Sequence, residues 1–579
     1  MKIKWFICSI LFVLSACHSE HQEQNDKDTQ SQLNSAESTA VSEKIAPHGA
    51  DALQAANAIN KTDLANHIKV LSSDKFGGRA PATEGETLSI NYMRDNFKKL
   101  NLKPANGDSY FQKVPLISVE AINHPHLEVK DKNNNTTNLS YLKDEMVWTR
   151  KQIDEASIKD SPMVFVGYGI NAPELGWNDY KGLNVKGKTV LMLVNDPGYA
   201  TQNPDLFNGN AMTYYGRWDY KYDEAAKQGA SAAIIIHQTK PAAYPWSTVS
   251  SSWSGPQFDR VRQNKGADLV NIEGWITHDN AQKLMASVGL NLENLEKAAQ
   301  QKDFKAVPLN LTASVHIENK LHQVDSHNVV AYLPGSTHPD EVFVYMAHWD
   351  HLGTDPTIEG DGIYNGALDN ASGSAGLLEL AKAFSSLKTK PQRSILFLSL
   401  TAEEQGLLGS AYYAAHPLFP LNKTVGGINM DMLNNFGRTR DVTIVGLGMS
   451  ELDSIIAKQA KLQHRVLKPD AEAEKGYFYR SDHFELSKKG VPMLYPNRGY
   501  DDLKRGVAYG MQQAKDYVAH HYHSPKDEFD PNWDLSGAVE DLQLYFYTGL
   551  SLANSQQWPN WNPGSEFKAL RDKQMQEKK

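Results

Sequence analysis

The second half of the chain alternates short apolar runs with amphipathic stretches, and this alternation constrains the fold more than any other feature. Helical patterns cover 371–387 and 409–416, and the apolar runs are VFVYMAH (342–348), SILFLSL (394–400), VGGINMD (425–431), VTIVGLG (442–448) and VPMLYPN (491–497). Strands that alternate with helices are typical of sheets covered by helices. We therefore expect an α/β fold with a mixed, largely parallel sheet flanked by helices.

A different pattern occupies residues 140–305 and predicts an inserted β-rich domain. Short β-rich runs are separated there by Gly, Pro and Asn, and they include PMVFVGYGI (162–170), KTVLMLVND (188–196) and SAAIIIHQTK (231–240). Two amphipathic helical patterns, 62–73 and 87–100, precede this region. From residue 48 onward we expect four segments: 48–139 as the first part of the main domain, 140–305 as the insert, 306–565 as the main domain proper, and 566–579 as a polar tail.

The first residues have the pattern of an export signal. Lys2 and Lys4 precede the apolar stretch WFICSILFVLSAC, which is too short to be a confident membrane span. Its end, LSAC, resembles the bacterial lipoprotein signal, which implies cleavage of 1–16 and a lipid anchor at Cys17. An ordinary signal peptide is the alternative. Residues 17–47 are polar and predict a disordered tether. The expected location is the bacterial cell envelope, with the protein anchored in the outer membrane.

Charge and cysteine content narrow the function classes. The net charge is −9 and no basic arm occurs, which argues against a nucleic-acid-binding protein. Cys8 and Cys17 are the only cysteines, so no intramolecular disulfide is possible once the leader is removed. Any metal site must therefore use histidines and carboxylates. The sequence leaves the oligomeric state open.

Potential metal ligands follow several of the predicted strands. Ligands bind beyond the carboxyl ends of strands in open α/β sheets. The candidates at the strand ends and in the flanking loops are two histidines and four carboxylates, a set of donors that suits Zn²⁺ without thiolates. They are His348, Asp369, Glu403, Glu404, Asp431 and His523. Each has an ordinary structural explanation when taken alone, such as a packed histidine or a helix cap. Their joint placement favours a site.

Five short motifs carry a resemblance to a known family. They are AHWDHLG (347–353), GALDNASG (366–373), AEEQGLLGS (402–410), NMDM (429–432) and YHSPKDE (522–528). Together they resemble the di-zinc aminopeptidases related to bacterial leucyl aminopeptidase and aminopeptidase Y, metallopeptidase family 28. The resemblance covers about 62–120 and 310–560, and it implies the zinc exopeptidase fold. The stretch DYKGLNVKGKTVLMLVNDPG (179–198) resembles the protease-associated domain of those enzymes.

The resemblance implies a division of labour among the candidates. Asp369 is implied to bridge two Zn²⁺ ions, with His348 and Asp431 on one ion and Glu404 and His523 on the other. Glu403 is implied as the general base, because two metal ions still require a separate proton acceptor. Asp350 suits a partner that orients His348. The neighbouring His351 is an alternative ligand that the family alignment ranks below His348.

Substrate contacts and the reaction remain broader expectations. The stretch YRSDHFELSKKGVP (479–492) resembles a family segment near the active site, which makes Asp482, His483, Tyr477 and Tyr479 candidates for substrate contact. The favoured function is an exported aminopeptidase acting on peptides. A carboxypeptidase or dipeptidase of the same fold is the alternative within the enzyme class. A non-catalytic, receptor-like binding protein, as the transferrin receptor is, is disfavoured because the ligand set and the base are retained.

Overall fold

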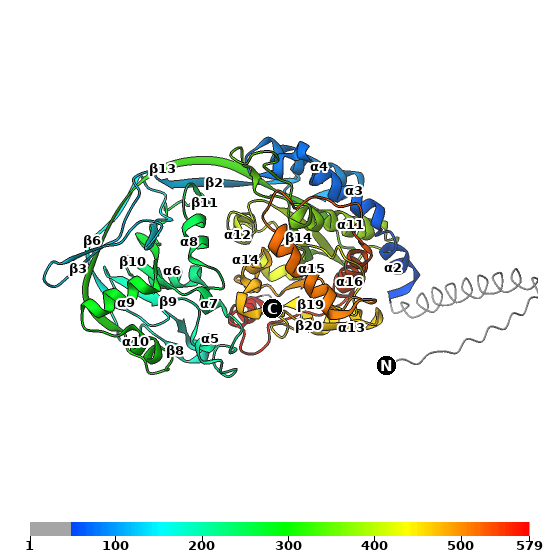
Figure 1. Cartoon of the computed structure of the whole chain (residues 1–579). Helices are drawn as coiled ribbons and strands as arrows, with labels where there is room; N and C mark the ends of the chain where they lie inside the picture. The colour runs from blue at the N-terminus through cyan, green and yellow to red at the C-terminus, as the bar shows by residue number, and fades with distance from the viewer. Residues whose placement is uncertain (1–47, 578–579) are drawn as a thin grey trace, which may run out of the picture. The chain divides into compact units, whose positions relative to one another are not determined.

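The computed structural model describes residues 48–577. The predicted signal peptide 1–16, the lipid site at Cys17 and the tether 17–47 lie outside the described residues. The described residues belong to two units, which divide between Gln54 and Ala55 within helix α2 (Gly49–Ala56). The unit from Ala55 onward contains the sheets and the candidate site (Figure 1). Within 48–577, no helix is both long and apolar enough to cross a bilayer.

A mixed sheet forms the centre of the predicted main domain. Four adjacent strands run parallel, in the spatial order β17 (Arg393–Leu400), β14 (His338–His348), β18 (Thr424–Asn429) and β21 (Met493–Asn497). Other strands extend both sides: β1 (Lys103–Pro104), β2 (Phe111–Ala121), β11 (Gln257–Arg260) and β13 (Val307–Leu333) beside β17, and β19 (Asp441–Val445) and β20 (Val466–Pro469) beside β21. The prediction of a mixed, largely parallel sheet flanked by helices is confirmed.

The helices of this domain follow the predicted pattern closely. The patterns at 62–73, 87–100, 371–387 and 409–416 become α3, α4, α11 and α12, and Asn60 and Thr83 cap the first two. The last helix forms within the predicted polar tail, where Arg571 is buried and donates to the Thr424 carbonyl. The helices are α3 (Lys61–Leu71), α4 (Glu84–Lys99), α11 (Ser372–Ser386), α12 (Leu408–Ala415), α13 (Leu452–Leu462), α14 (His483–Ser487), α15 (Gly506–His520), α16 (Ser536–Ala553) and α17 (Lys568–Glu577).

The inserted region has its own sheet. The strands β6 (Glu155–Phe165), β9 (Thr189–Leu193), β10 (Ala232–His237) and β12 (Ile272–Thr277) run parallel, and β5 (Glu145–Trp148) pairs antiparallel with β12. Its helices and remaining strands are β3 (Glu128–Asp131), β4 (Thr136–Asn138), β7 (Asn171–Ala172), β8 (Trp177–Asn178), α5 (Pro197–Thr201), α6 (Trp218–Lys227), α7 (Thr239–Ala242), α8 (Trp246–Ser252), α9 (His278–Ser287) and α10 (Leu292–Ala299).

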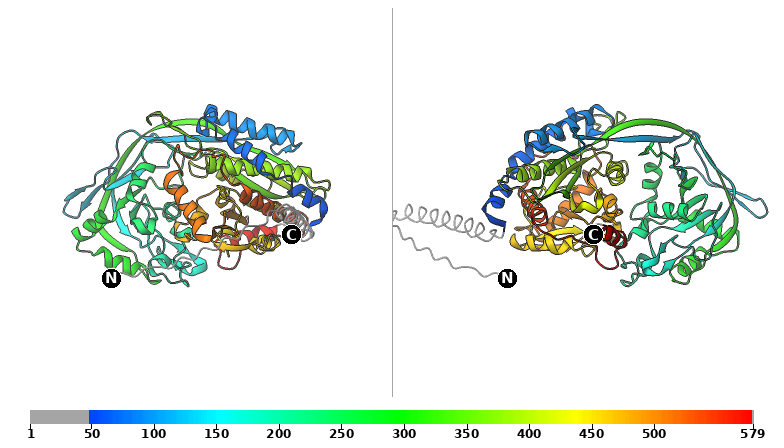
Figure 2. Two further views of the ribbon diagram at one scale, coloured as in Figure 1. Left: turned by 45° about the vertical axis from the view of Figure 1, so that its right-hand side comes forward. Right: turned by 180° about the vertical axis from the view of Figure 1, so that it is seen from behind.

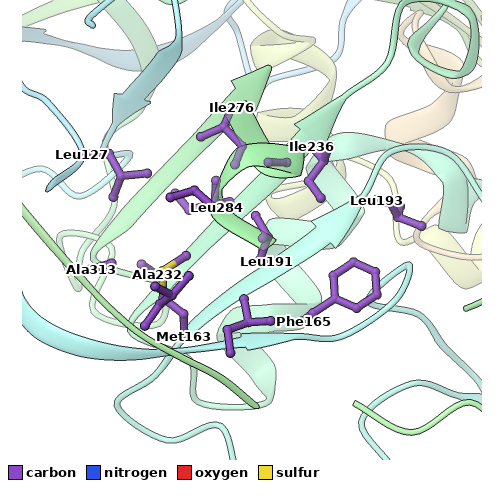
Figure 3. Close-up of a cluster of buried hydrophobic side chains, with 14 of the residues drawn as sticks. Leu127, Met163, Phe165, Leu191, Leu193, Ala232, Ile236, Ile276, Leu284 and Ala313 are labelled. Carbon is purple, nitrogen blue, oxygen red and sulfur yellow. The ribbon is translucent and has the colours of Figure 1, made fainter. Parts of the chain in front are cut away.

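One strand belongs to both sheets. The first part of β13 pairs with β3 and β6 in the insert, and the second part pairs with β2 and β17. Figure 2 shows β13 and β2 side by side from two further directions. The apolar core of the insert includes Phe165, Leu191 and Ile236, together with Leu127 and Ala313 (Figure 3). Those last two lie outside the predicted range 140–305, because β3 and β13 complete the sheet.

The register of the parallel strands sets where the site lies. His348 at the end of β14 is opposite Leu400 at the end of β17, and Met346 is opposite Asn429 at the end of β18. The carboxyl ends of the three strands therefore meet at one edge of the sheet. The loops that follow them carry most of the candidate ligands. The other short elements are η2 (Asp74–Arg79), η3 (Pro173–Leu175), η4 (Tyr214–Gly216), η5 (Ala367–Ala371), η6 (Leu421–Lys423), η7 (Ala473–Lys475), η8 (Tyr477–Tyr479), β15 (Gly353–Thr354) and β16 (Ile363–Tyr364).

Candidate metal centre

His348 is held between two carboxylates at the edge of the sheet. Its Nε2 atom lies 3.4 Å from Asp369 Oδ1 and 3.4 Å from Asp431 Oδ1. Its Nδ1 atom lies 3.1 Å from the backbone carbonyl of Asp350. The side chain is only 2% exposed. The strand end thus fixes the imidazole in an orientation that directs Nε2 toward Asp369 and Asp431.

A second imidazole meets the other oxygen of Asp369. His523 Nε2 lies 3.3 Å from Asp369 Oδ2 and 3.1 Å from Glu404 Oε2. The remaining Glu404 oxygen, Oε1, lies 2.6 Å from Nδ1 of His351. The structure therefore brings together all the residues that the resemblance implies as ligands, and it also keeps the alternative, His351, against Glu404. Their roles as ligands stay predictions.

Ligand atoms of these residues gather in three overlapping sets. Within each set the atoms lie within 4.8 Å of one another, and the sets are His348 with Asp369 and Asp431, His351 with Asp369 and Glu404, and His348 with Glu403 and Glu404. Nitrogen and oxygen donors without sulfur fit Zn²⁺. The donor chemistry of the site is therefore compatible with the predicted metal.

Asp350 supports the glutamate pair more directly than it supports His348. Its Oδ1 accepts the backbone N–H of Glu403 at 3.1 Å, and its Oδ2 accepts that of Glu404 at 3.3 Å. The distance from its Oδ1 to His348 Nδ1 is 3.8 Å, which is too long for a hydrogen bond. The contact to the imidazole comes instead from the Asp350 backbone carbonyl. Asp350 therefore positions the turn that carries Glu403 and Glu404.

The Glu403 carboxylate differs from its neighbours in having no bonded partner. Among residues 48–577 it takes part in none of the hydrogen bonds or ion pairs, whereas both oxygens of Glu404 are engaged. Burial raises the pKa of Glu403 well above its usual range, although His348 opposes that shift. A carboxylate with a raised pKa is a stronger proton acceptor near neutral pH.

Opposite charges govern the pKa values on the other side of the site. Burial and Asp369 oppose ionisation of Glu404, but His523 and His351 outweigh both, and the pKa of Glu404 falls to about 2. Burial also disfavours the imidazolium of His523, yet Glu404 and Asp369 raise its pKa to about 10. The carboxylates of this cluster therefore stabilise positive charge at neutral pH, as a cation site must.

The four candidates for substrate contact separate into two pairs. Asp482 and His483 are fully buried and do not line the cavity beside the site. Burial raises the pKa of Asp482 to about 7 and lowers that of His483 to about 3. Tyr477 and Tyr479 do line the cavity. The tyrosines can therefore reach a ligand in the cavity, whereas Asp482 and His483 lie behind its wall.

Two residues outside the predicted set support the loops of the site. The buried Arg79 guanidinium donates to the carbonyls of Leu71, Trp349, Asn365 and Gly366, and so joins the loops that precede Asp369 and follow His348. It lies in the loop GGRAPATEG, which has no pattern that predicts a buried arginine.

Asp527 supports the bridging candidate from its other side. Its carboxylate accepts the backbone N–H groups of Leu368 and Asp369 and the hydroxyl of Tyr517. The peptide bond between Asp369 and Asn370 is cis. Asp527 is part of the motif YHSPKDE, so the sequence contains a signal for it.

A cavity of about 1870 Å³ opens onto the site. Glu403, Glu404, Asp369, Asp431 and His523 line one part of it. Residues of the insert, among them Trp148, Trp218 and Trp253, line another part. The volume admits a peptide of several residues.

A family comparison matches most of the region that builds this site. The model of peptidase family M28 matches residues 328–547. This segment is therefore similar to peptidase family M28. It contains every residue that was predicted as a metal ligand or base, whereas Arg79 and the insert lie before it.

Individual relatives match shorter stretches than the M28 segment. A probable zinc metalloprotease of Pyrenophora teres f. teres is 37% identical over 118 residues, which are 20% of this chain and 25% of that protein. The aminopeptidase NAALADL1 of Mus musculus is 34% identical over 130 residues, 22% of this chain and 16% of that protein. The chain thus matches a quarter or less of the length of these relatives.

A solved structure aligns with most of this chain. The aminopeptidase from Aneurinibacillus sp. strain AM-1 aligns over 89% of this chain and 97% of its own, with 20% identity and a TM-score of 0.47.

Proposed function

We propose that the protein is an exported aminopeptidase that removes the N-terminal residue of peptides with two zinc ions and Glu403 as general base. The M28 similarity and the zinc metalloprotease relatives support the broader statement, a zinc-dependent peptide hydrolase. The aminopeptidase relative supports the narrower one. The number of ions, the base and the export are our inference from the residues.

One observation carries the proposal: the two oxygens of Asp369 face two different histidines. Oδ1 lies 3.4 Å from His348 and Oδ2 lies 3.3 Å from His523. Each histidine is close to one further carboxylate, Asp431 or Glu404. Two ligand sets that share one carboxylate suit two adjacent metal ions.

The residues around Glu403 suit the transfer of a proton. Zinc, when bound, would activate water and polarise the scissile carbonyl. The Glu403 carboxylate faces the cavity without a bonded partner and can accept the proton of the attacking water, then deliver it to the leaving amine. Asp350 holds the Glu403 backbone through its N–H group, which fixes the position of that carboxylate.

The proposed location depends on residues 1–17 alone. The charged start, the apolar stretch and LSAC support cleavage before Cys17 and attachment of lipid there. In Cys17→Ala we expect the lipid mass to be lost and the protein to leave the membrane fraction, because stable anchoring requires at least two acyl chains or a second signal, and the attachment site is removed. Wild-type protein found wholly in the soluble fraction without lipid mass would refute the anchor.

The experiment that tests the activity compares three forms of one peptide. The zinc-loaded protein is incubated with the free peptide, its N-acetyl form and its C-terminal amide, and the released residues are identified by mass spectrometry. A free amine can coordinate zinc or pair with the site carboxylates, so its acetylation should reduce kcat/KM by about a hundredfold. In a long peptide, whose C-terminus lies far from the scissile bond, the amide should be cleaved as fast as the free peptide.

The opposite pattern would favour the alternative enzyme. Rapid cleavage of the acetylated peptide together with an inert amide would indicate a carboxypeptidase of the same fold. An inactive protein that still binds zinc would indicate a receptor-like role.

A further inference from the structure

Arg498 is a nearly buried cation in the wall of the cavity beside the metal centre. It follows β21 directly, and its side chain, 7% exposed, lines the same cavity as Glu403, Asp431 and His523. Its guanidinium carbon lies 5.6 Å from the ring centroid of Tyr517, which is within cation–π range.

The charge of Arg498 is not balanced by a neighbouring carboxylate. Arg150, Arg262 and Lys488 line the same cavity, and each pairs with an Asp or Glu at 2.6 to 2.8 Å. Within the described part of the chain, Arg498 forms no ion pair, and its guanidinium donates no hydrogen bond. A buried guanidinium with five N–H donors normally has acceptors, because burying it without them is costly.

The carboxylate that attracts Arg498 is already engaged. Asp527 attracts the guanidinium electrostatically, but its carboxylate accepts hydrogen bonds from Leu368, Asp369 and Tyr517. Burial lowers the pKa of Arg498, which shows that its surroundings stabilise the cation less well than water does.

The surroundings also place Arg498 close to the reaction site. Two of its electrostatic neighbours are Tyr495 and Tyr517. The Tyr495 hydroxyl lies 3.4 Å from Asp431 Oδ2, and the Tyr517 hydroxyl lies 2.9 Å from Asp527 Oδ2. Tyr517 thus connects the guanidinium to the carboxylate that holds the Asp369 backbone.

We propose that Arg498 binds a carboxylate of the peptide substrate through two parallel N–H···O bonds. This inference rests on the proposed peptidase function and adds a substrate class, peptides with a carboxylate near the scissile bond. The carboxylate is either the C-terminus of a very short peptide or the side chain of an acidic residue. Both offer the planar pair of oxygens that a guanidinium binds in bidentate fashion.

The test compares matched acid and amide substrates. Leu-Ala is paired with Leu-Ala-amide for the terminal carboxylate, and Leu-Glu-amide and Glu-Ala-amide are paired with their Gln counterparts for the side chain. For at least one pair, wild-type protein should show kcat/KM about 10- to 100-fold higher for the acid, the usual worth of hydrogen bonds to a charged group. Arg498→Gln should bring that ratio close to one.

Two further variants separate recognition from structural damage. Arg480→Gln is the matched control, because Arg480 lines the same cavity and also forms no ion pair among the described residues, but is exposed to solvent. It should keep the wild-type ratio. Arg498→Lys keeps the charge but loses the planar pair of N–H donors, so its acid-to-amide ratio of kcat/KM should be intermediate. If Arg498→Gln does not fold, Arg498→Lys alone decides the question.

The outcomes for the subsite and for the peptidase function are distinguishable. Hydrolysis of the amides with the same acid-to-amide ratio in wild type and Arg498→Gln would overturn the subsite and leave the peptidase function intact. If no peptide is hydrolysed, calorimetric titration of the zinc-loaded protein with Leu-Ala and Leu-Ala-amide still tests the subsite. Tighter binding of the acid that depends on Arg498 would support it, and equal binding of the two would refute it.

Discussion

The buried charges around Arg150 in the insert are balanced, whereas the candidate metal centre has an excess of carboxylates. In the insert, Arg150 pairs with Glu273 at 2.7 Å and with Asp223 at 2.8 Å, and Trp148 donates to the same glutamate. At the edge of the main sheet, carboxylates outnumber the imidazoles that face them. They are Asp350, Asp369, Glu403, Glu404 and Asp431, facing His348, His351 and His523.

This difference separates a structural charge cluster from a ligand site. Buried ion pairs in which each charge has a partner are neutral without a ligand. A buried cluster with an excess of carboxylates has a lower free energy when it binds a cation. Arg498 shows the same principle with the opposite sign. Among the described residues its guanidinium has neither a carboxylate partner nor a hydrogen-bond acceptor, whereas the donors of the buried Arg79 meet carbonyl groups. Charge balance thus indicates which buried ionic groups await a ligand.

The largest effect is expected from the two adjacent glutamates. Glu403→Gln should keep zinc near two ions per chain and lower kcat by about 100- to 10,000-fold, the usual range for loss of a general base. Glu404→Ala should instead lose zinc, because both of its oxygens face histidines. Metal analysis and steady-state kinetics on both variants check this. Equal zinc content and equal activity in the two would refute the division of labour.

Substitutions in the Arg150 cluster of the insert should change the free energy of unfolding. Arg150→Met leaves Glu273, whose side chain is fully buried, without its cation, and removal of one partner of a buried pair costs about 3 kcal/mol of unfolding free energy. Urea denaturation followed by tryptophan fluorescence measures this. The double variant Arg150→Met with Glu273→Gln removes both charges and should recover most of the loss. A double variant as unstable as the single one would show that packing of Arg150, not charge balance, is responsible.

Periodicity and strand-end position predicted much of the fold and indicated which candidate side chains come together. The runs ending at His348, Leu400 and Asn429 are strands because apolar β-branched and aromatic residues bounded by turns favour them. The parallel register then brings the residues after those ends to one edge. These two steps require only local patterns, which a single sequence contains.

The rest depended on contacts between residues far apart in the chain. Arg79 contacts carbonyls more than 260 positions away, and no local pattern distinguishes it from an exposed loop arginine. Asp350 was expected to orient His348, but its carboxylate holds the Glu403 and Glu404 backbone instead. Asp482 and His483 matched a family segment, yet side-chain burial is decided by the packing of the whole domain.

A smaller effect is expected from Asp350→Asn. One amide oxygen can still accept a backbone N–H, but the new NH₂ group faces the other N–H and cannot bond to it. We expect kcat/KM to fall about tenfold and zinc affinity to weaken, as for other groups that orient ligands. Competition with a chelator measures the affinity. Asp361→Asn is the control, because Asp361 is exposed and accepts only a local backbone N–H at 3.0 Å. Equal effects of the two substitutions would exclude a positioning role for Asp350.

The smallest effect should come from Glu145, a buried carboxyl group of the insert that lies outside the Arg150 cluster. Its side chain is fully buried at the start of β5, and neither carboxylate oxygen has a hydrogen-bond partner among the described residues. Burial raises its pKa from the usual 4.5 to about 8. Between these values the folded protein binds one proton more than the unfolded chain, so stability falls as the pH rises.

Glu145→Gln should remove this pH dependence, because glutamine stays neutral. Between about pH 6 and about pH 7 the wild type should lose about 1 kcal/mol more unfolding free energy than the variant does. Urea denaturation at both pH values measures the difference, and Glu155→Gln, an exposed position on β6, serves as the control. If the wild type and Glu145→Gln changed in parallel with pH, Glu145 would be ionised in the folded protein, and a cation near it would have to balance its charge. The insert would then contain a buried, ionised carboxylate without a protein partner, and at this position it would resemble the candidate metal centre instead of differing from it.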